Sequence, residues 1–298
     1  KSQVAPFGRS CSTNSTSPVT PGNFASFRYF RQAVAAGHET TVYVRNREKM
    51  EQVFFEVFRV PALFAASSAA LVLQTLSSHP LSGVVLESGA GITSATPVYC
   101  GHPIPHAIQQ LALAGNDLTD WMETLLHQCG YPDMAGIQWR DVIQDVKEKL
   151  CYVALEYEAE VAKVMEDPGS FAKDYESPGG GPLVRIGIER FRCPEALFQP
   201  ELAGVGDGAA GVHSMVYNAV NACDDADVRT ALWERVVLDG GSMRFPGMAA
   251  RLQRELEALV ATEAQGGGVA ECLGGTAGRR TTVAKVEVKA QLPNVCAW

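Results

Sequence analysis

The stretch Val84-Val85-Leu86-Glu87-Ser88-Gly89-Ala90-Gly91 joins an apolar run to a glycine-rich turn, and a second apolar run follows over residues 92–99. Alternate glycines between two such runs predict a hairpin whose backbone comes close to another group. Residues 236–242 form a second unit, in which three apolar residues precede Asp239-Gly240-Gly241-Ser242. Backbone N–H groups in such turns bind anions, and an adjacent acid can hold a hydrated metal ion. The two units, separated by a long charged helix, predict a nucleotide cleft.

Helical and strand-like patterns alternate along the rest of the chain. Met50, Val53, Phe54, Val57 and Phe58 have helical spacing, which predicts a helix that starts near residue 46 and ends before residue 61. The same reasoning predicts further helices over residues 62–76, 118–128, 139–165, 214–221, 227–234 and 246–260. Strands are expected over residues 84–86, 92–99, 183–188, 236–238 and 283–290. This alternation predicts the α/β class.

Two segments differ in composition from the rest. Residues 1–38 contain four basic residues and no acid, and residues 10–20 are almost entirely Ser, Thr, Asn and Pro. We expect residues 1–45 to be a disordered or unrelated N-terminal extension, with an organelle transit peptide as the alternative. The glycine-rich residues 262–282 predict a flexible insertion.

Composition excludes several classes of protein. The chain has 298 residues with 25 Lys and Arg against 33 Asp and Glu, a net charge of −8, which argues against binding to nucleic acid or to an anionic membrane. Eight cysteines without a C-x-x-C pair predict reduced thiols of an intracellular protein. Residues 60–86 carry no charge, but prolines and polar residues interrupt them, so a membrane span is not expected.

Other motifs favour ordinary loops over catalytic sites. Residues 206–211 match G-x-G-x-x-G, but no strand is expected before them, as a dinucleotide site requires. His102 and His106 are separated by two prolines that prevent a shared helical face for a metal. Ser88 follows a strand as a nucleophile would, but Leu86 stands where the G-x-S-x-G motif has glycine.

Three longer strings are similar to the actin family. They are Leu113-Ala114-Gly115-Asn116-Asp117-Leu118-Thr119-Asp120, Lys147-Glu148-Lys149-Leu150-Cys151-Tyr152-Val153-Ala154-Leu155 and Glu189-Arg190-Phe191-Arg192-Cys193-Pro194-Glu195-Ala196-Leu197-Phe198-Gln199-Pro200. The likeness runs from about residue 46 to residue 260 and resumes at residues 283–298. It identifies a divergent actin-related or actin-like protein that is expected to lack the family's N-terminal third and C-terminal segment.

The resemblance implies the fold shared by actin, sugar kinases and Hsp70, in which two α/β lobes hold ATP or ADP with Mg²⁺ between them. Residues 46–77 would be remnant helices of the first lobe, and residues 78–298 the second lobe. Among the residues that would contact the cofactor, Ser88, Gly89 and Gly91 match a phosphate-binding turn. The others match the adenosine side of the cleft: Lys147, Glu148, Gly240, Gly241 and Phe245.

Departures from the family pattern fall on the catalytic positions. Actins have Asp-Ser-Gly-Asp-Gly where this chain has Glu87 and Ala90 at the two acidic positions, so metal binding by Glu87 is in question. Ser68 and Ser94 stand where actins have a water-orienting glutamine and a histidine, and Asn294 replaces a lysine near the adenine. No counterpart of the first phosphate-binding turn is found in residues 1–45. Because phosphoryl transfer depends on positioning and charge neutralisation, efficient ATP hydrolysis is not expected.

The resemblance then predicts a structural or scaffold protein of a cytoskeletal or axonemal assembly in the cytoplasm. Its partners would be proteins, including other actin-family subunits, because apolar helices over residues 47–76 would otherwise be exposed. The alternatives are a polymerising, ATP-binding actin-like ATPase represented by a partial sequence, and a nuclear actin-related subunit of a chromatin-remodelling complex. A nuclear or organellar location stays open.

Overall fold

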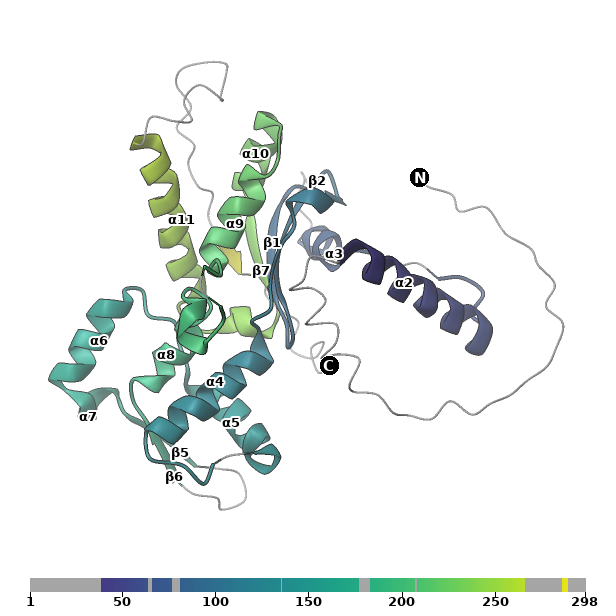
Figure 1. Ribbon diagram of the computed structural model, residues 1–298. Helices are drawn as coiled ribbons and strands as arrows, with labels where there is room; N and C mark the ends of the chain where they lie inside the picture. The colour runs from purple at the N-terminus through teal and green to yellow at the C-terminus, as the bar shows by residue number, and fades with distance from the viewer. Residues whose placement is uncertain are drawn as a thin grey trace. The chain divides into compact units, whose positions relative to one another are not determined.

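The computed structural model describes residues 39–63, 66–76, 81–134, 136–176, 183–206, 208–265 and 286–288 (Figure 1). The chain divides into two compact units, Lys1–Met50 and Glu51–Trp298. Of the first unit, the structure describes the part of helix α2 (Glu39–Gln52) that ends at Met50. The second unit contains every other described element.

The second unit is built on a mixed sheet with the strand order β3-β2-β1-β7-β8, in which β4 also pairs with β2. Strands β1 (Gly83–Ser88) and β2 (Thr93–Tyr99) are antiparallel, so the predicted hairpin is confirmed. Strand β1 runs parallel to β7 (Val236–Asp239), which runs parallel to β8 (Val286–Val288). The short strands β3 (His102–Pro103) and β4 (Gln109–Leu111) extend the antiparallel side and were not predicted.

Helices cover the two faces of this sheet unequally (Figure 1). Val84 and Leu86 of β1 join the main core with helices α9 (Val212–Asn221), α10 (Ala226–Trp233) and α11 (Met248–Gln265). Val85, on the opposite face because side chains alternate along a strand, packs with helix α3 (Ser68–Thr75). Figure 1 shows α9, α10 and α11 on one side of the sheet and α3 on the other. The α/β class predicted from the sequence is therefore confirmed.

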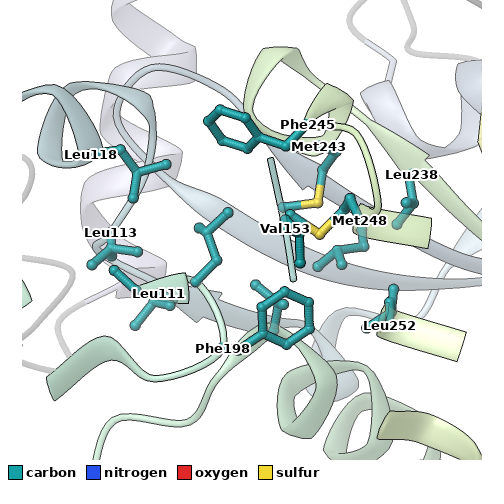
Figure 2. Packing of buried hydrophobic residues seen from close by; sticks show 14 of the residues in the cluster. Leu111, Leu113, Leu118, Val153, Phe198, Leu238, Met243, Phe245, Met248 and Leu252 are labelled. Carbon is teal, nitrogen blue, oxygen red and sulfur yellow. The ribbon is translucent and has the colours of Figure 1, made fainter. Parts of the chain in front are cut away.

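The main core continues below the sheet into a second group of helices. It contains α4 (Gly115–Gln128), α5 (Ile137–Leu150) and α8 (Glu189–Glu195), with the hairpin of β5 (Lys173–Glu176) and β6 (Leu183–Ile186). Helices α6 (Tyr157–Glu166) and α7 (Pro168–Phe171) complete it. The remaining short helices are η1 (Val53–Val57), η2 (Pro105–Ala107), η3 (Pro200–Ala203) and η4 (Gly241–Arg244). Figure 2 shows leucines, methionines and phenylalanines from both regions in contact.

The long helix expected over residues 139–165 is wrong. Helix α5 ends at Leu150, residues 151–154 are extended, and α6 begins at Tyr157. The backbone N–H of Tyr152 donates to the Arg190 carbonyl at 3.0 Å, and that of Val153 donates to the Pro246 carbonyl at 2.8 Å. Carbonyls from distant parts of the chain thus accept the hydrogen bonds that carbonyls of the preceding helical turn would accept in a continuous helix. No glycine or proline in the sequence indicates that the helix ends here.

Other helix boundaries also differ from the prediction. Helix α2 begins at Glu39, seven residues before the expected start near residue 46. The apolar residues of its first turns, Val42, Tyr43 and Val44, are consecutive and so give no helical spacing in the sequence. Helix α3 begins only at Ser68, and Leu71 is exposed, so the buried helix expected over residues 62–76 is shorter and partly exposed. Helix α4 begins at Gly115, because Asp117 accepts the N–H of Ala114 from within the first turn.

The helices expected near the C-terminal half are confirmed within two residues at most boundaries. The exception is α11, which continues to Gln265 and so occupies the start of the insertion expected over residues 262–282. Residues 266–282 lie outside the described residues, as does most of the N-terminal extension. Within the described part of the chain, no helix is both long and apolar enough to cross a membrane.

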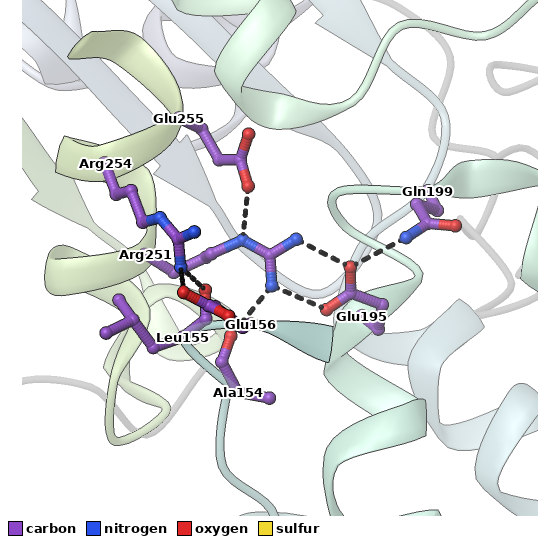
Figure 3. Close-up of polar contacts among 8 residues, drawn as sticks. All are labelled: Ala154, Leu155, Glu156, Glu195, Gln199, Arg251, Arg254 and Glu255. Atoms are coloured by element: carbon purple, nitrogen blue, oxygen red, sulfur yellow. Dashed lines mark hydrogen bonds and ion pairs between the residues drawn. The ribbon is translucent and has the colours of Figure 1, made fainter. Parts of the chain in front are cut away.

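A buried ion pair joins α11 to α8 (Figure 3). Arg251 donates to both carboxylate oxygens of Glu195, at 3.0 and 3.3 Å, and to the Ala154 carbonyl at 2.8 Å. The guanidinium also contacts Glu255 and lies 4.9 Å from the centre of the Phe198 ring. Burial raises the pKa of Glu195 above its ordinary value, although Arg251 opposes this shift. The pair therefore anchors the extended segment between α5 and α6.

The cysteines of the described chain differ in exposure, which gives a testable order of reactivity. The thiol of Cys129 is exposed but donates to Glu189 Oε1 at 2.8 Å, and burial together with this bond raises its pKa to about 12. We expect iodoacetamide at pH 8 to label Cys100 faster than Cys129, because the thiolate is the nucleophile. Glu189→Gln should accelerate labelling of Cys129 by about tenfold, the equivalent of one pKa unit.

The measurement is the time course of peptide labelling by mass spectrometry. Cys151, Cys193 and Cys223 are buried and should stay unlabelled in the folded protein. Equal rates at Cys100 and Cys129 in the wild type, or an unchanged Cys129 rate in Glu189→Gln, would contradict the proposed control by Glu189.

Candidate functional site

The two glycine turns predicted from the sequence lie next to each other at the carboxyl ends of two neighbouring strands, β1 and β7. The parallel register of β1 and β7 pairs Glu87 with Asp239, so both strands end at the same level. The turn over residues 88–91 therefore follows one strand, and the turn over residues 239–242 follows its neighbour. Ligands in α/β proteins bind at the carboxyl ends of parallel strands. The carboxyl ends of β1 and β7, with the two turns that follow them, are the candidate site.

The first turn of α4 holds the backbone of the 88–91 turn. The N–H of Gly115 donates to the Gly89 carbonyl at 2.9 Å, and the N–H of Asn116 donates to the Ala90 carbonyl at 2.8 Å. The hydroxyl of Ser242, from the second turn, also donates to the Gly89 carbonyl at 3.4 Å. The carbonyls of the turn thus point into the protein, which fixes the position of the turn without a ligand.

Gly240 permits the close approach of the two turns. Its φ is +91°, and a Cβ at this position would clash with the Ser88 backbone. Both features require glycine, so this residue is explained by the packing of the protein alone. Gly240 was predicted from the resemblance to face a cofactor, and its backbone lies against β1.

For three other glycines of the site, contacts within the protein do not explain why the residue is glycine. A Cβ added to Gly89, Gly91 or Gly241 would meet no atom within 4 Å. None of the three has a φ in the left-handed region. Neither conformation nor packing within the described chain therefore demands glycine there. The open space above both turns allows a bound group to approach the backbone closely, as an anion such as phosphate does.

The side chain of Ser88 is enclosed by the protein. It is fully buried, and its Oγ is 2.7 Å from Thr93 Oγ1. Thr93 donates its own proton to the Leu113 carbonyl at 2.6 Å, so Ser88 is the donor to Thr93. Ser88 thus holds β1 against β2 and has the surroundings of a structural hydroxyl, unlike the exposed nucleophile of the hydrolase alternative.

The substituted catalytic positions meet on the face of the sheet that α3 covers. The hydroxyl of Ser68, at the start of α3, donates to Glu87 Oε2 at 2.7 Å. Ser94 of β2 lies directly opposite Glu87 in the antiparallel register. Asp239 lies beside Glu87 on the other neighbouring strand. The carboxylate of Glu87 is therefore already bound by Ser68, in the space where the family resemblance implies a hydrated metal.

Lys147 is enclosed by the protein. The residue is 5% exposed, and its Nζ donates to the Gly115 carbonyl at 2.7 Å and to Thr119 Oγ1 at 2.8 Å. Burial lowers its pKa below the ordinary value for lysine. Lys147 thus connects α5 to the turn of α4 that holds Gly89. Glu148, the next residue of α5, is exposed and accepts a hydrogen bond from Gln144 at 2.8 Å.

Phe245 is the remaining predicted contact of the cofactor. Only 8% of the residue is exposed, and its ring packs in the main core with Met243 and Met248 (Figure 2). Asn294, the substituted position near the adenine, lies outside the described residues. Of the predicted contacts, Gly89, Gly91 and Gly241 therefore have open space beside them, Glu148 is exposed on α5, and Phe245 and Lys147 are inside the protein.

Sequence reasoning missed the residues of α4 that support the site. The sequence marks Gly115, Asn116 and Thr119 only as part of a string that resembles the family, because its pattern predicts a helix that begins after Asp117. A signal was present, since glycine and asparagine are both common where helices begin. Ser242 was included in the second turn but given no contact.

The residues of the candidate site fit a phosphate better than a metal ion. The open backbone at Gly89, Gly91 and Gly241 suits a phosphate. A metal fits less well: the described residues contain no group of three or more His, Cys, Asp and Glu side chains arranged to hold an ion.

A comparison with known protein families gives a match over most of the chain. The family model described as Actin matches residues 38–272, which is well over half of the chain. The matched region begins one residue before α2 and includes both glycine turns, α4 and α5.

Proposed function

The chain belongs to the actin family, and from this premise we propose that it is a structural or scaffold protein of a cytoskeletal assembly in the cytoplasm. In this proposal it binds ATP or ADP only through a degenerate site and does not hydrolyse ATP efficiently. The observation that carries the proposal is the hydrogen bond between Ser68 and Glu87. Both residues replace side chains that the family resemblance implies for catalysis, and here they satisfy each other.

The electrostatics of the site support loss of hydrolysis. Glu87 and Asp239 place two acidic side chains side by side at the strand ends. Two carboxylates repel a polyphosphate unless a cation lies between them. The nearest buried cation, Lys147, donates to protein oxygens at 2.7 and 2.8 Å. Without strong charge neutralisation at the phosphates, the reaction loses the main source of its acceleration.

The open glycines support residual nucleotide binding. Gly89, Gly91 and Gly241 leave space for phosphate oxygens beside the backbone of the two turns. When bound, the nucleotide would supply the phosphates and the protein would supply the two turns and α5. Other actin-family subunits are the proposed protein partners, and a nuclear complex is the alternative setting for the same scaffold role.

The experiment replaces the open glycines in the full chain. Gly89→Ala and Gly241→Ala should weaken binding of a fluorescent ATP analogue by about tenfold or more, because each new methyl group occupies the approach to the backbone. Both variants should be as stable as the wild type or more stable by about 0.4–1 kcal/mol, since alanine restricts the unfolded chain. Binding is measured by fluorescence anisotropy, and stability by urea denaturation.

Gly206→Ala is the matched control, because Gly206 also has open space around a Cβ and no left-handed φ, and it lies outside the site. It should leave binding unchanged. Release of phosphate from ATP should stay at the level of a protein-free blank. Steady turnover by the wild-type chain would overturn the loss of hydrolysis, and binding insensitive to both substitutions would overturn the assignment of the turns.

A further inference from the structure

The hairpin of β5 and β6 forms a small sheet of its own, separate from the main sheet (Figure 1). Its antiparallel register pairs Tyr175 with Val184 and Asp174 with Arg185. Tyr175 and Val184 are buried in the main core, and Arg185 is exposed. A two-stranded sheet has two edges, where backbone N–H and C=O groups can pair with a strand of another chain.

A tyrosine from the loop after α4 closes the outer edge of β6, the side that faces away from β5. The Arg185 N–H donates to the Tyr131 hydroxyl at 2.9 Å, and this hydroxyl donates to the Arg185 carbonyl at 3.4 Å. In an antiparallel pair, the N–H and C=O of one residue point to the same side, and the side alternates along the strand. Both groups of Arg185 therefore point away from β5. One side-chain hydroxyl takes the place of a neighbouring strand.

The end of α4 holds Tyr131 in position independently of the hairpin. Gly130 follows the helix with a φ of +97°. Its N–H donates to the His127 carbonyl at 3.2 Å, and the N–H of Tyr131 donates to the Leu126 carbonyl at 3.1 Å. These two bonds form a Schellman motif, whose left-handed residue is glycine here. Because Tyr131 also packs against the main core, its hydroxyl is held at the edge of β6 by other parts of the protein.

We propose that Tyr131 is an autoinhibitory guard: its hydroxyl occupies the outer edge of β6 and prevents this edge from pairing with β6 of a second copy of the chain. The proposal goes beyond the proposed function and does not depend on nucleotide binding. A second copy is the competing strand because it presents the same edge, and two identical edges can pair about a two-fold axis. Main-chain hydrogen bonds supply the affinity when a strand is added to a sheet.

The charge of Arg185 protects the same edge. In a pairing of two β6 strands centred on this residue, the two guanidinium groups would lie opposite each other and repel. The Arg185 side chain is 60% exposed, and its ion pair with Asp174 is long at 3.7 Å, so its charge stays available to repel a second copy. Leu183, which is 55% exposed, would instead favour an incoming strand. A sharp test therefore removes both Tyr131 and the charge.

Hydrogen exchange of the Arg185 amide, measured by NMR, tests the contact itself. Tyr131→Phe keeps the ring and removes the acceptor, so this amide should exchange about fivefold faster or more than in the wild type. The Val184 amide is the internal control, because it points toward β5, and its rate should change by less than about twofold. Tyr99→Phe is the matched variant, since Tyr99 is 37% exposed and lies in β2, and it should change neither rate. Equal acceleration of the Arg185 and Val184 amides in Tyr131→Phe would overturn the specific role at the edge.

Sedimentation velocity of the full chain at about 1–100 μM tests the consequence, which is self-association. Arg185→Thr removes the charge, keeps the N–H and should sediment as the wild type does, because Tyr131 is still present. Tyr131→Ala/Arg185→Thr should associate at least about tenfold more tightly than Arg185→Thr alone, because its edge is open and uncharged. Tyr131→Ala/Arg185→Pro is the matched control, since proline also removes the charge but offers no N–H to an incoming strand. It should sediment as the wild type does.

Comparison between the variants isolates the edge of β6, because association through any other surface is common to all of them. Circular dichroism and urea denaturation show whether each variant is folded. If Tyr131→Ala/Arg185→Thr sediments like Arg185→Thr at about 100 μM, the guard is overturned. Equally strong association of the proline variant would also overturn it, because the contact would not use the N–H at position 185. Should Tyr131→Ala fail to fold, the exchange rate of Arg185 in Tyr131→Phe decides.

Discussion

Arg251→Met is expected to lower the free energy of unfolding by about 3–5 kcal/mol, the cost of leaving a buried charge without its partner. Glu195 is fully buried and the Arg251 side chain is 8% exposed, so water cannot replace the lost guanidinium. The variant also loses the donor to the Ala154 carbonyl and the contact with the Phe198 ring. Methionine replaces the aliphatic part of the arginine side chain, which limits the cavity left behind. Urea denaturation followed by circular dichroism measures the effect.

The pH dependence of the same variant separates charge from packing. Burial already raises the pKa of Glu195 in the wild type, and removal of Arg251 should raise it further. A carboxyl whose pKa is raised by folding binds its proton more tightly in the folded state, so its contribution to stability falls as pH rises through the folded pKa. Arg251→Met should therefore regain part of its stability as pH is lowered from 7 toward 5. A loss of stability that is equal at pH 7 and at pH 5 would indicate that the substitution acts through packing alone.

Two further variants complete the test. Arg254→Met removes an exposed ion pair with Glu156, in which both side chains are about half exposed, and should cost less than about 1 kcal/mol. In the double variant Arg251→Met/Glu195→Leu the uncompensated charge is gone, so much of the lost stability should return. A double variant less stable than Arg251→Met would contradict this account.

The periodicity of the sequence predicted most of the elements but not the pairing that forms the site. The hairpin of β1 and β2 could be predicted, because the strands and their glycine turn are adjacent along the chain. The parallel pairing of β1 with β7 could not, because most of the chain lies between Glu87 and Asp239. The break after Leu150 was missed for a related reason. Its cause is a set of distant carbonyls, Arg190 and Pro246, and not a local helix-breaking residue.

The sequence predicted which residues form the candidate site better than it predicted what each of them contacts. The sequence indicated the turns at Gly89 and Gly241, and the structure places them together at the carboxyl ends of β1 and β7. It could not indicate that Lys147 donates to Gly115, because burial of a lysine depends on packing between α4 and α5. Likewise, Ser68 and Glu87 were identified as separate substitutions. Their hydrogen bond appears only when α3 packs on the sheet.

That hydrogen bond leads to the second large expected effect, a gain of metal-dependent nucleotide binding. We expect the triple variant Ser68→Gln/Glu87→Asp/Ala90→Asp to bind ATP at least about tenfold more tightly with Mg²⁺ than without it, and the wild type to show little Mg²⁺ dependence. The shorter carboxylate at position 87 leaves room for a hydrated ion, and the new acid at exposed position 90 provides a second negative charge. Isothermal titration with ATP, with and without Mg²⁺, measures the difference.

Single variants identify which change matters. Ser68→Ala removes the donor to Glu87 and should cost about 0.5–1.5 kcal/mol of stability or less, because the bond is exposed to solvent. It should not create Mg²⁺ dependence by itself, since Glu87 is still too long. Glu56→Asp is the matched control, because Glu56 also accepts a side-chain hydrogen bond, from Gln52 at 3.0 Å, and lies outside the site. If the triple variant binds ATP equally with and without Mg²⁺, the Ser68–Glu87 pair is not what excludes the metal. The cause of weak metal binding would then lie in the backbone donors around the phosphates, because no change at Glu87 can supply them.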